Sequence, residues 1–236
     1  MTAPDQRALD VVGRIAARRA VGWRALADAF SPPTTQGVLA LRAGEARATI
    51  VHATAWLDSD RDRFDPDLAL LDASGRAAST LELNDVVDQL TTEHTRLFAD
   101  GTGLVALLES AYLPAGEPAT AIRAILDAHQ LTVSESEVAP DHLRSQLAVA
   151  ATLAERERDL WATGDFEQAK ALRVVQQEFL IAHPARFVPA LCDCLTRAAR
   201  LDLYRGWAGV LRSYLSIEAG VDYGRTLPSQ RFQATT

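Results

Sequence analysis

The residues most suggestive of chemistry are Asp141 and His142, which stand side by side in the stretch EVAPDHLRSQL at 137–147. A carboxylate that orients a histidine is part of many general-base sites, but such sites also need a nucleophile or a metal. Pro140 is typical of the first turn of a helix and predicts that a long helix begins here. Neighbouring helical residues point about 100° apart, so Asp141 is poorly placed to orient His142. With no third group apparent, the sequence favours a binding feature over a catalytic couple.

The helical pattern after this pair predicts where the two side chains point. Two apolar rows follow, one through Leu143 and Leu147 and one through Val149 and Leu153, and His142 stands at the head of the second row. We therefore expect His142 at the edge of the core. Asp141 falls off both rows, so we expect it to face outward, where the positive end of the helix dipole would favour its charge.

Two other motifs resemble ligand sites, but each lacks residues or structural context that such a site requires. The run DSDRDRFDPD at 58–67 looks like a calcium loop, but Arg63 and Ala69 stand where an EF-hand needs Gly and Glu. The sequence GTGLVA at 101–106 resembles a nucleotide fingerprint, yet it follows a predicted helix instead of a strand and no Walker lysine follows it. We expect a solvated acidic loop at the first place and no nucleotide site at the second.

The histidines and cysteines do not predict a metal centre. The five histidines include no Glu-x-x-His pair of a di-iron bundle and no two histidines four residues apart. His94 falls on the buried face of its helix, where a hydrogen-bonded core histidine is expected. Cys192 and Cys194, two residues apart on a helix, point to different faces, which argues against a disulfide or a shared metal. We expect no cofactor.

Composition and charge restrict the class of protein. The 236 residues are 48% hydrophobic and 23% charged, which is typical of a soluble globular chain. Apolar runs are far shorter than the ~20 residues that span a bilayer, and the first ten residues lack the pattern of an export signal, so we expect a cytoplasmic protein without membrane insertion. The net charge of −7 argues against nucleic acid over the whole surface. The adjacent arginines Arg18 and Arg19 lie opposite and beside the apolar stripe of the first helix, and we expect both to be solvated.

Apolar spacing of three and four residues recurs along the chain and predicts helices, with no convincing strand. The expected fold class is all-α, a compact multi-helix bundle. A capping box formed by Ser79 and Glu82 predicts a helix start before Leu83. The expected helices cover about 9–30, 36–57, 66–73, 83–98, 118–129, 140–162, 165–182, 186–199 and 202–219, with a structured loop at 100–117.

The polar connector is the best internal boundary of a single domain over 1–220. We expect an N-terminal lobe at about 1–129, a hinge at 130–139, a C-terminal lobe at about 140–220 and a flexible tail at 221–236. A hinge between two helical lobes would also permit a homodimer by domain exchange.

Three segments together resemble the TorD/DmsD family, which is related to the NarJ group. The stretch E-x-x-P-D-H-L at 137–143, followed by Leu147, is similar to the family's linker motif. The segment EHTRLFADGTGLVALLESAYL at 93–113 is similar to its E-Y-x-R-L-F segment and the E-S-x-Y that follows. FLIAHPARFVPAL at 179–191 is similar to its F-L-x-x-H segment. The resemblance covers roughly residues 80–217, and it departs from the family pattern at Gln146, where an acidic residue is usual.

The resemblance implies a TorD-like fold and a chaperone, not an enzyme. Such chaperones bind the twin-arginine leader or the catalytic subunit of a molybdenum-containing oxidoreductase and hold it until its cofactor is inserted. A leader offers an arginine pair and an apolar helix, so its receptor should offer carboxylates beside an apolar groove. The candidate partner-binding residues are Glu109, Tyr112, Glu137, Pro140, Asp141 and His142.

Two alternatives remain open from the sequence. A helical transcriptional regulator is favoured by residues 1–57, where seven arginines face four acidic residues, although no recognition helix is evident. An enzyme would need a nucleophile, a base and an orienting group that converge, and the sequence predicts no such set. The sequence does not determine which molybdenum enzyme is the client.

Overall fold

A computed structural model describes residues 6–57, 60–113, 116–131 and 139–221. Over these residues the fold is all-α, as predicted, and it contains no β-strand. The helices are α1 (Gln6–Ala29), α2 (Thr35–Arg42), α3 (Glu45–Ala53), α4 (Asp65–Ala78), α5 (Leu83–Phe98), α6 (Pro118–Ala128), α7 (Leu143–Thr163), α8 (Phe166–Ala182), α9 (Pro184–Ala198) and α10 (Asp202–Ala219), with 3-10 turns η1 (Arg61–Phe64) and η2 (Glu109–Ala111). None of the described helices is long and apolar enough to span a bilayer.

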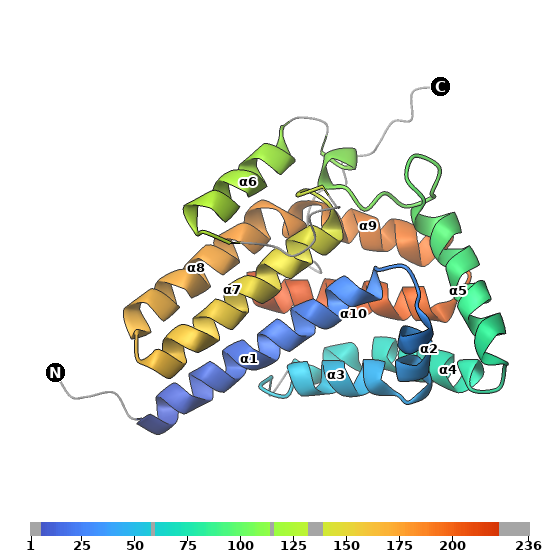
Figure 1. The fold of residues 1–236 in the computed structure, drawn as a ribbon, viewed down its shortest axis with the longest axis horizontal. Helices are drawn as coiled ribbons and strands as arrows, with labels where there is room; N and C mark the ends of the chain where they lie inside the picture. The colour runs from blue at the N-terminus through green and yellow to red at the C-terminus, as the bar shows by residue number, and fades with distance from the viewer. Residues whose placement is uncertain (1–5, 58–59, 114–115, 132–138, 222–236) are drawn as a thin grey trace.

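The first helix follows the predicted stripe and packs along α7 (Figure 1). Ala16, Ala20 and Trp23 are buried, and the helix ends before the prolines of the 31–33 turn. Trp23 meets Tyr214 of α10 edge to face, with ring centroids 4.8 Å apart. A side chain at Gly22 would overlap the ring of Tyr214, so the glycine is what permits α1 to approach α10 this closely.

The predicted helix over 36–57 is wrong as a single element. It is divided into α2 and α3 by Gly44, whose φ of +75° is left-handed and ends the first helix. Thr34 caps α2 by accepting a hydrogen bond from the amide of Gly37 at 3.0 Å. The predicted capping box is also wrong: Ser79 ends α4, and its hydroxyl donates to the carbonyl of Gly75 at 2.9 Å.

The acidic stretch at 60–67 is more structured than the predicted solvated loop, and residues 58–59 lie outside the described residues. Phe64 of η1 is fully buried, which anchors the start of α4 in the core. Asp67, in the first turn of α4, is half-buried and packs directly on the backbone of Gly209 in α10. Burial raises the pKa of Asp67 to about 6, against the opposing charge of Arg212.

One continuous core joins the predicted lobes. Helix α10 contacts α4, α8 and α9, and α1, α7 and α8 lie side by side across the molecule (Figure 1). The apolar residues buried between them form a single cluster that runs from Trp23 to Ala219. The division into lobes and the exchange of domains stay predictions. Most of the predicted hinge (132–138) and all but Val221 of the predicted tail lie outside the described residues.

Candidate functional site

A buried carboxylate, Glu109, lies where the three family-like segments meet. Its side chain is 1% exposed, and it accepts a hydrogen bond of 2.8 Å from the Nε2 amide of Gln146 in α7. The Nδ1 atom of His183, at the junction of α8 and α9, lies 3.1 Å from the same carboxylate. The predictions named Glu109 but not the two residues that contact it. Each of the three stands in a different one of the segments that carried the resemblance.

The backbone beside Glu109 pairs with the residues that precede α7. The amide of Glu109 donates to the carbonyl of Asp141 at 2.9 Å, and the amide of Leu143 donates to the carbonyl of Leu107 at 2.7 Å. These bonds flank an antiparallel bridge between Leu108 and His142. We call the two paired segments, 107–110 and 141–143, the latch. It fixes the loop after α5 to the start of α7.

The prediction that Asp141 faces outward is wrong. Asp141 is 5% exposed, and its carboxylate accepts a hydrogen bond from the amide of Ser110 at 3.3 Å. The reason is that α7 begins at Leu143 and not at Pro140, so Asp141 lies in the turn before the helix and its side chain points back to the loop. Pro140 lies in the same turn and is half-buried.

His142 is the N-cap of α7. Its Nδ1 atom accepts a hydrogen bond from the amide of Arg144 at 3.1 Å, which is the task that Ser, Asp or Asn performs at most helix starts. Burial, with a further contribution from the charge of Arg144, lowers the pKa of His142 to about 4. The ring is therefore neutral at pH 7, half-buried at the edge of the core as predicted. The hydrogen bonds accepted by its ring and by the carboxylate of Asp141 come from different backbone amides, those of Arg144 and Ser110.

The outer face of the latch region is partly apolar. Tyr112 is half-buried: its ring lies against Phe187 with centroids 5.8 Å apart, and its hydroxyl donates to the carbonyl of Ala106 at 3.0 Å. Burial raises the pKa of Tyr112 well above its usual value. Leu104 is 60% exposed, the most exposed large apolar side chain of the described chain. Glu137, the remaining predicted site residue, lies outside the described residues.

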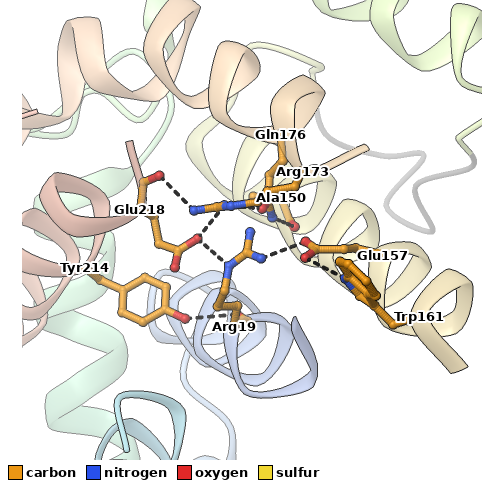
Figure 2. Close-up of polar contacts among 8 residues, drawn as sticks. All are labelled: Arg19, Ala150, Glu157, Trp161, Arg173, Gln176, Tyr214 and Glu218. Atoms are coloured by element: carbon orange, nitrogen blue, oxygen red, sulfur yellow. Dashed lines mark hydrogen bonds and ion pairs between the residues drawn. The ribbon is translucent and has the colours of Figure 1, made fainter. Parts of the chain in front are cut away.

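The prediction that Arg19 is solvated is wrong. Its side chain is 3% exposed and lies between Glu157 of α7 and Glu218 of α10, at 2.7 and 2.8 Å (Figure 2). Burial lowers the pKa of Arg19, but the two carboxylates outweigh burial and raise that pKa above its usual value. Arg173 of α8 adds a second ion pair to Glu218 at 3.0 Å. The sequence did contain a signal for this burial: Arg19 stands three residues after Ala16, a spacing that places both on the same, buried face of the helix.

An apolar groove of about 650 Å³ lies between α1, α2 and α3 and reaches α10. We call it the α1–α2 groove. Along α1 it is lined by Ala17, Val21, Ala25 and Ala29, and deeper in it by Leu41, Tyr204 and Trp207. The sequence analysis missed this groove, because it predicted α2 and α3 as one helix and could not place either of them against α1.

The family model described as nitrate reductase delta subunit matches residues 62–193, more than half of the chain. The chain belongs to the nitrate reductase delta subunit family. Members of this family are chaperones for the maturation of molybdenum enzymes and are not themselves enzymes. No curated protein and no solved structure matches the sequence closely enough to refine this assignment.

The described part of this delta-family chaperone holds no cluster of three or more His, Cys, Asp or Glu side chains arranged for a metal ion. Cys192 and Cys194 are free, as predicted, and Cys192 is buried. Burial raises the pKa of the Cys192 thiol to about 12, so this cysteine is a packed core residue and not a reactive thiolate.

Proposed function

We propose that this chaperone works in the cytoplasm on one molybdenum-containing oxidoreductase. It binds the enzyme's apo catalytic subunit, its twin-arginine leader, or both, and holds it until the cofactor is inserted before export or assembly. Among family members it would resemble the TorD/DmsD type. The observation that carries this proposal is the convergence of the three family-like segments on Glu109, a residue of the latch, together with the exposure of an apolar residue, Leu104, three positions before the latch in the chain.

The six predicted residues take two roles in this proposal. Tyr112, Pro140 and His142 are only half-buried and would contact the client, together with Glu137 of the connector. Glu109 and Asp141 are hydrogen-bonded inside the protein, so they act by holding the latch in the shape that the client recognises. Replacing either carboxylate removes a bond to the latch and should weaken client binding without touching the client directly.

Co-purification tests this proposal. The tagged chaperone is isolated from its own host, grown under conditions where molybdenum enzymes are expressed, and its companions are identified by mass spectrometry. We expect the catalytic subunit of a molybdenum enzyme with wild type, and less of it with Glu109→Ala and Asp141→Ala. Absence of any such subunit from the wild-type preparation would refute the proposal.

A surface variant separates client contact from loss of structure. Leu104→Glu places a charge on the exposed apolar loop, and Leu81→Glu places the same charge on another exposed leucine, 48% exposed, between α4 and α5. We expect Leu104→Glu alone to reduce the recovered catalytic subunit. Equal recovery with the two variants would contradict a client surface beside the latch.

The alternative of a DNA-binding regulator gains no support from the arginines of the N-terminal segment. Arg19, Arg24 and Arg47 are ion-paired within the protein, and Arg42 donates to the carbonyl of Leu81. These groups are less available to phosphates than the sequence count suggested.

A further inference from the structure

We propose that the α1–α2 groove binds the apolar helical part of a client's leader, with the basic residues before that part held by Asp28 and Glu45. This inference rests on the proposed function, because it assigns one portion of the client to one surface of the chaperone. The groove shares no residue with the latch, so the two surfaces can fail independently.

The shape of the groove fits a helix. Its α1 wall runs from Ala17 to Ala29, which is twelve helical steps and therefore about 18 Å at 1.5 Å per residue. An apolar helix of about twelve residues has this length, within the ~7–15 residues of a typical leader's apolar region. Four of the α1 residues that line the groove are alanines (Ala17, Ala20, Ala25 and Ala29), and small side chains allow a second helix to approach closely. Val21 is 37% exposed on this wall, an apolar contact that a partner would cover.

The charges at the rim select the partner. Arg24 is held by Glu155 through two hydrogen bonds of 2.8 Å, and Arg158 pairs with Asp159 at 2.7 Å. These cations are therefore already neutralised. The rim carboxylates of Asp28 and Glu45, in contrast, have no ion pair or side-chain hydrogen bond to any residue that the structure describes.

The two unpaired carboxylates define a direction along the groove. Asp28 is the penultimate residue of α1. Glu45 is the first residue of α3, which runs antiparallel to α1 (Figure 1). Both therefore lie at the end of the groove near the C-terminus of α1. A leader with two arginines placed there would extend its apolar helix along α1 toward Ala17. An acidic helix would be repelled at the same place.

The test is a binding titration with a fluorescein-labelled synthetic peptide that carries two adjacent arginines before about twelve alternating Ala and Leu residues. Binding is followed by fluorescence anisotropy at low and high salt. We expect Asp28→Asn combined with Glu45→Gln to weaken binding roughly five- to thirtyfold at low salt, as two exposed ion pairs are lost. The matched control, Asp88→Asn with Glu178→Gln, removes two exposed carboxylates elsewhere and should leave binding unchanged. A peptide with both arginines replaced by glutamine should bind the wild type and the Asp28/Glu45 variant equally.

The apolar wall is tested by Val21→Asp, with Val174→Asp of α8, 53% exposed, as its control. We expect Val21→Asp to reduce peptide affinity at least tenfold because it places a charge against the bound apolar helix. Unchanged affinity in Val21→Asp overturns the groove assignment. If wild type captures a catalytic subunit but does not bind the peptide, the groove inference fails and the proposed function stands. If it does neither, both fail.

Discussion

The ion network around Arg19 predicts a large and specific loss of stability on mutation. Arg19→Met removes one hydrogen bond to Glu157 and one to Glu218, whose side chains are 4% and 0% exposed. Arg173 still pairs with Glu218, whereas Glu157 keeps one hydrogen bond within the described residues, from the indole N–H of Trp161 at 3.3 Å, and only a more distant attraction to Arg173. Removing one partner of a buried ion pair costs about 3–5 kcal/mol, because the remaining charge stays buried without compensation. We expect a decrease of this size in the free energy of unfolding.

Urea unfolding followed by circular dichroism measures this decrease. Arg18→Met is the matched control, since Arg18 is the preceding residue of α1 and is only half-buried, and it should change stability by less than about 0.5 kcal/mol. Arg19→Lys should also be destabilised, because a single ammonium cannot reproduce the fork that reaches two carboxylates on different helices. Replacing Glu157 with Leu in the Arg19→Met background should recover part of the loss. A decrease below about 1 kcal/mol for Arg19→Met would refute the reasoning.

Two further predictions concern pH. The pKa of His142 is lower in the folded protein than in the unfolded chain, so its contribution to stability is present above about pH 6.5 and is lost as pH falls toward 4, by at most about 3 kcal/mol. His142→Asn keeps a cap without this titration, so a pH series of urea midpoints should be flatter for the variant; parallel curves would contradict the assignment. The pKa of Asp67 is raised, so its effect has the opposite sign: the stability it contributes below about pH 4 is lost as pH rises through 6. Asp67→Asn should therefore be more stable than wild type at pH 7.5, by about 1–3 kcal/mol, and this gain should disappear below pH 4; a destabilised variant at pH 7.5 would show that the carboxylate is better paired than we infer.

The long helices could be predicted because the apolar spacing that identifies a helix repeats over several turns in each of them. The long helices α1, α5, α8 and α10 each carry several turns of apolar spacing, and the structure places them within a few residues of the predicted ranges. Short signals were less reliable. Ser79 and Glu82 match the capping-box pattern of a helix start, yet α4 extends to Ala78 and Ser79 is its C-cap. Gly44 ends α2 because the chain turns there to pack α3 on α1, a tertiary requirement that helical spacing does not contain.

The candidate site was predicted in part, since its residues were found and their surroundings were not. Glu109 stood out by resemblance and Asp141 by its place beside His142, but the expected exposure of Asp141 followed from a helix start at Pro140. The structure begins α7 three residues later, because His142 can cap it through its ring nitrogen. That shift turns Asp141 inward to the amide of Ser110.

The sequence by itself determined the all-α class, the positions of the long helices and the family-like segments, since these depend on the order of residues within one helix turn or one motif. Only the tertiary structure decided that Glu109 contacts Gln146 and His183, which are 37 and 74 residues away along the chain. It alone decided that Arg19 is buried between two carboxylates and that α1, α2, α3 and α10 line a groove. The physical reason is that burial and charge pairing depend on which helix faces are brought together, and helical periodicity identifies a face without identifying its partner.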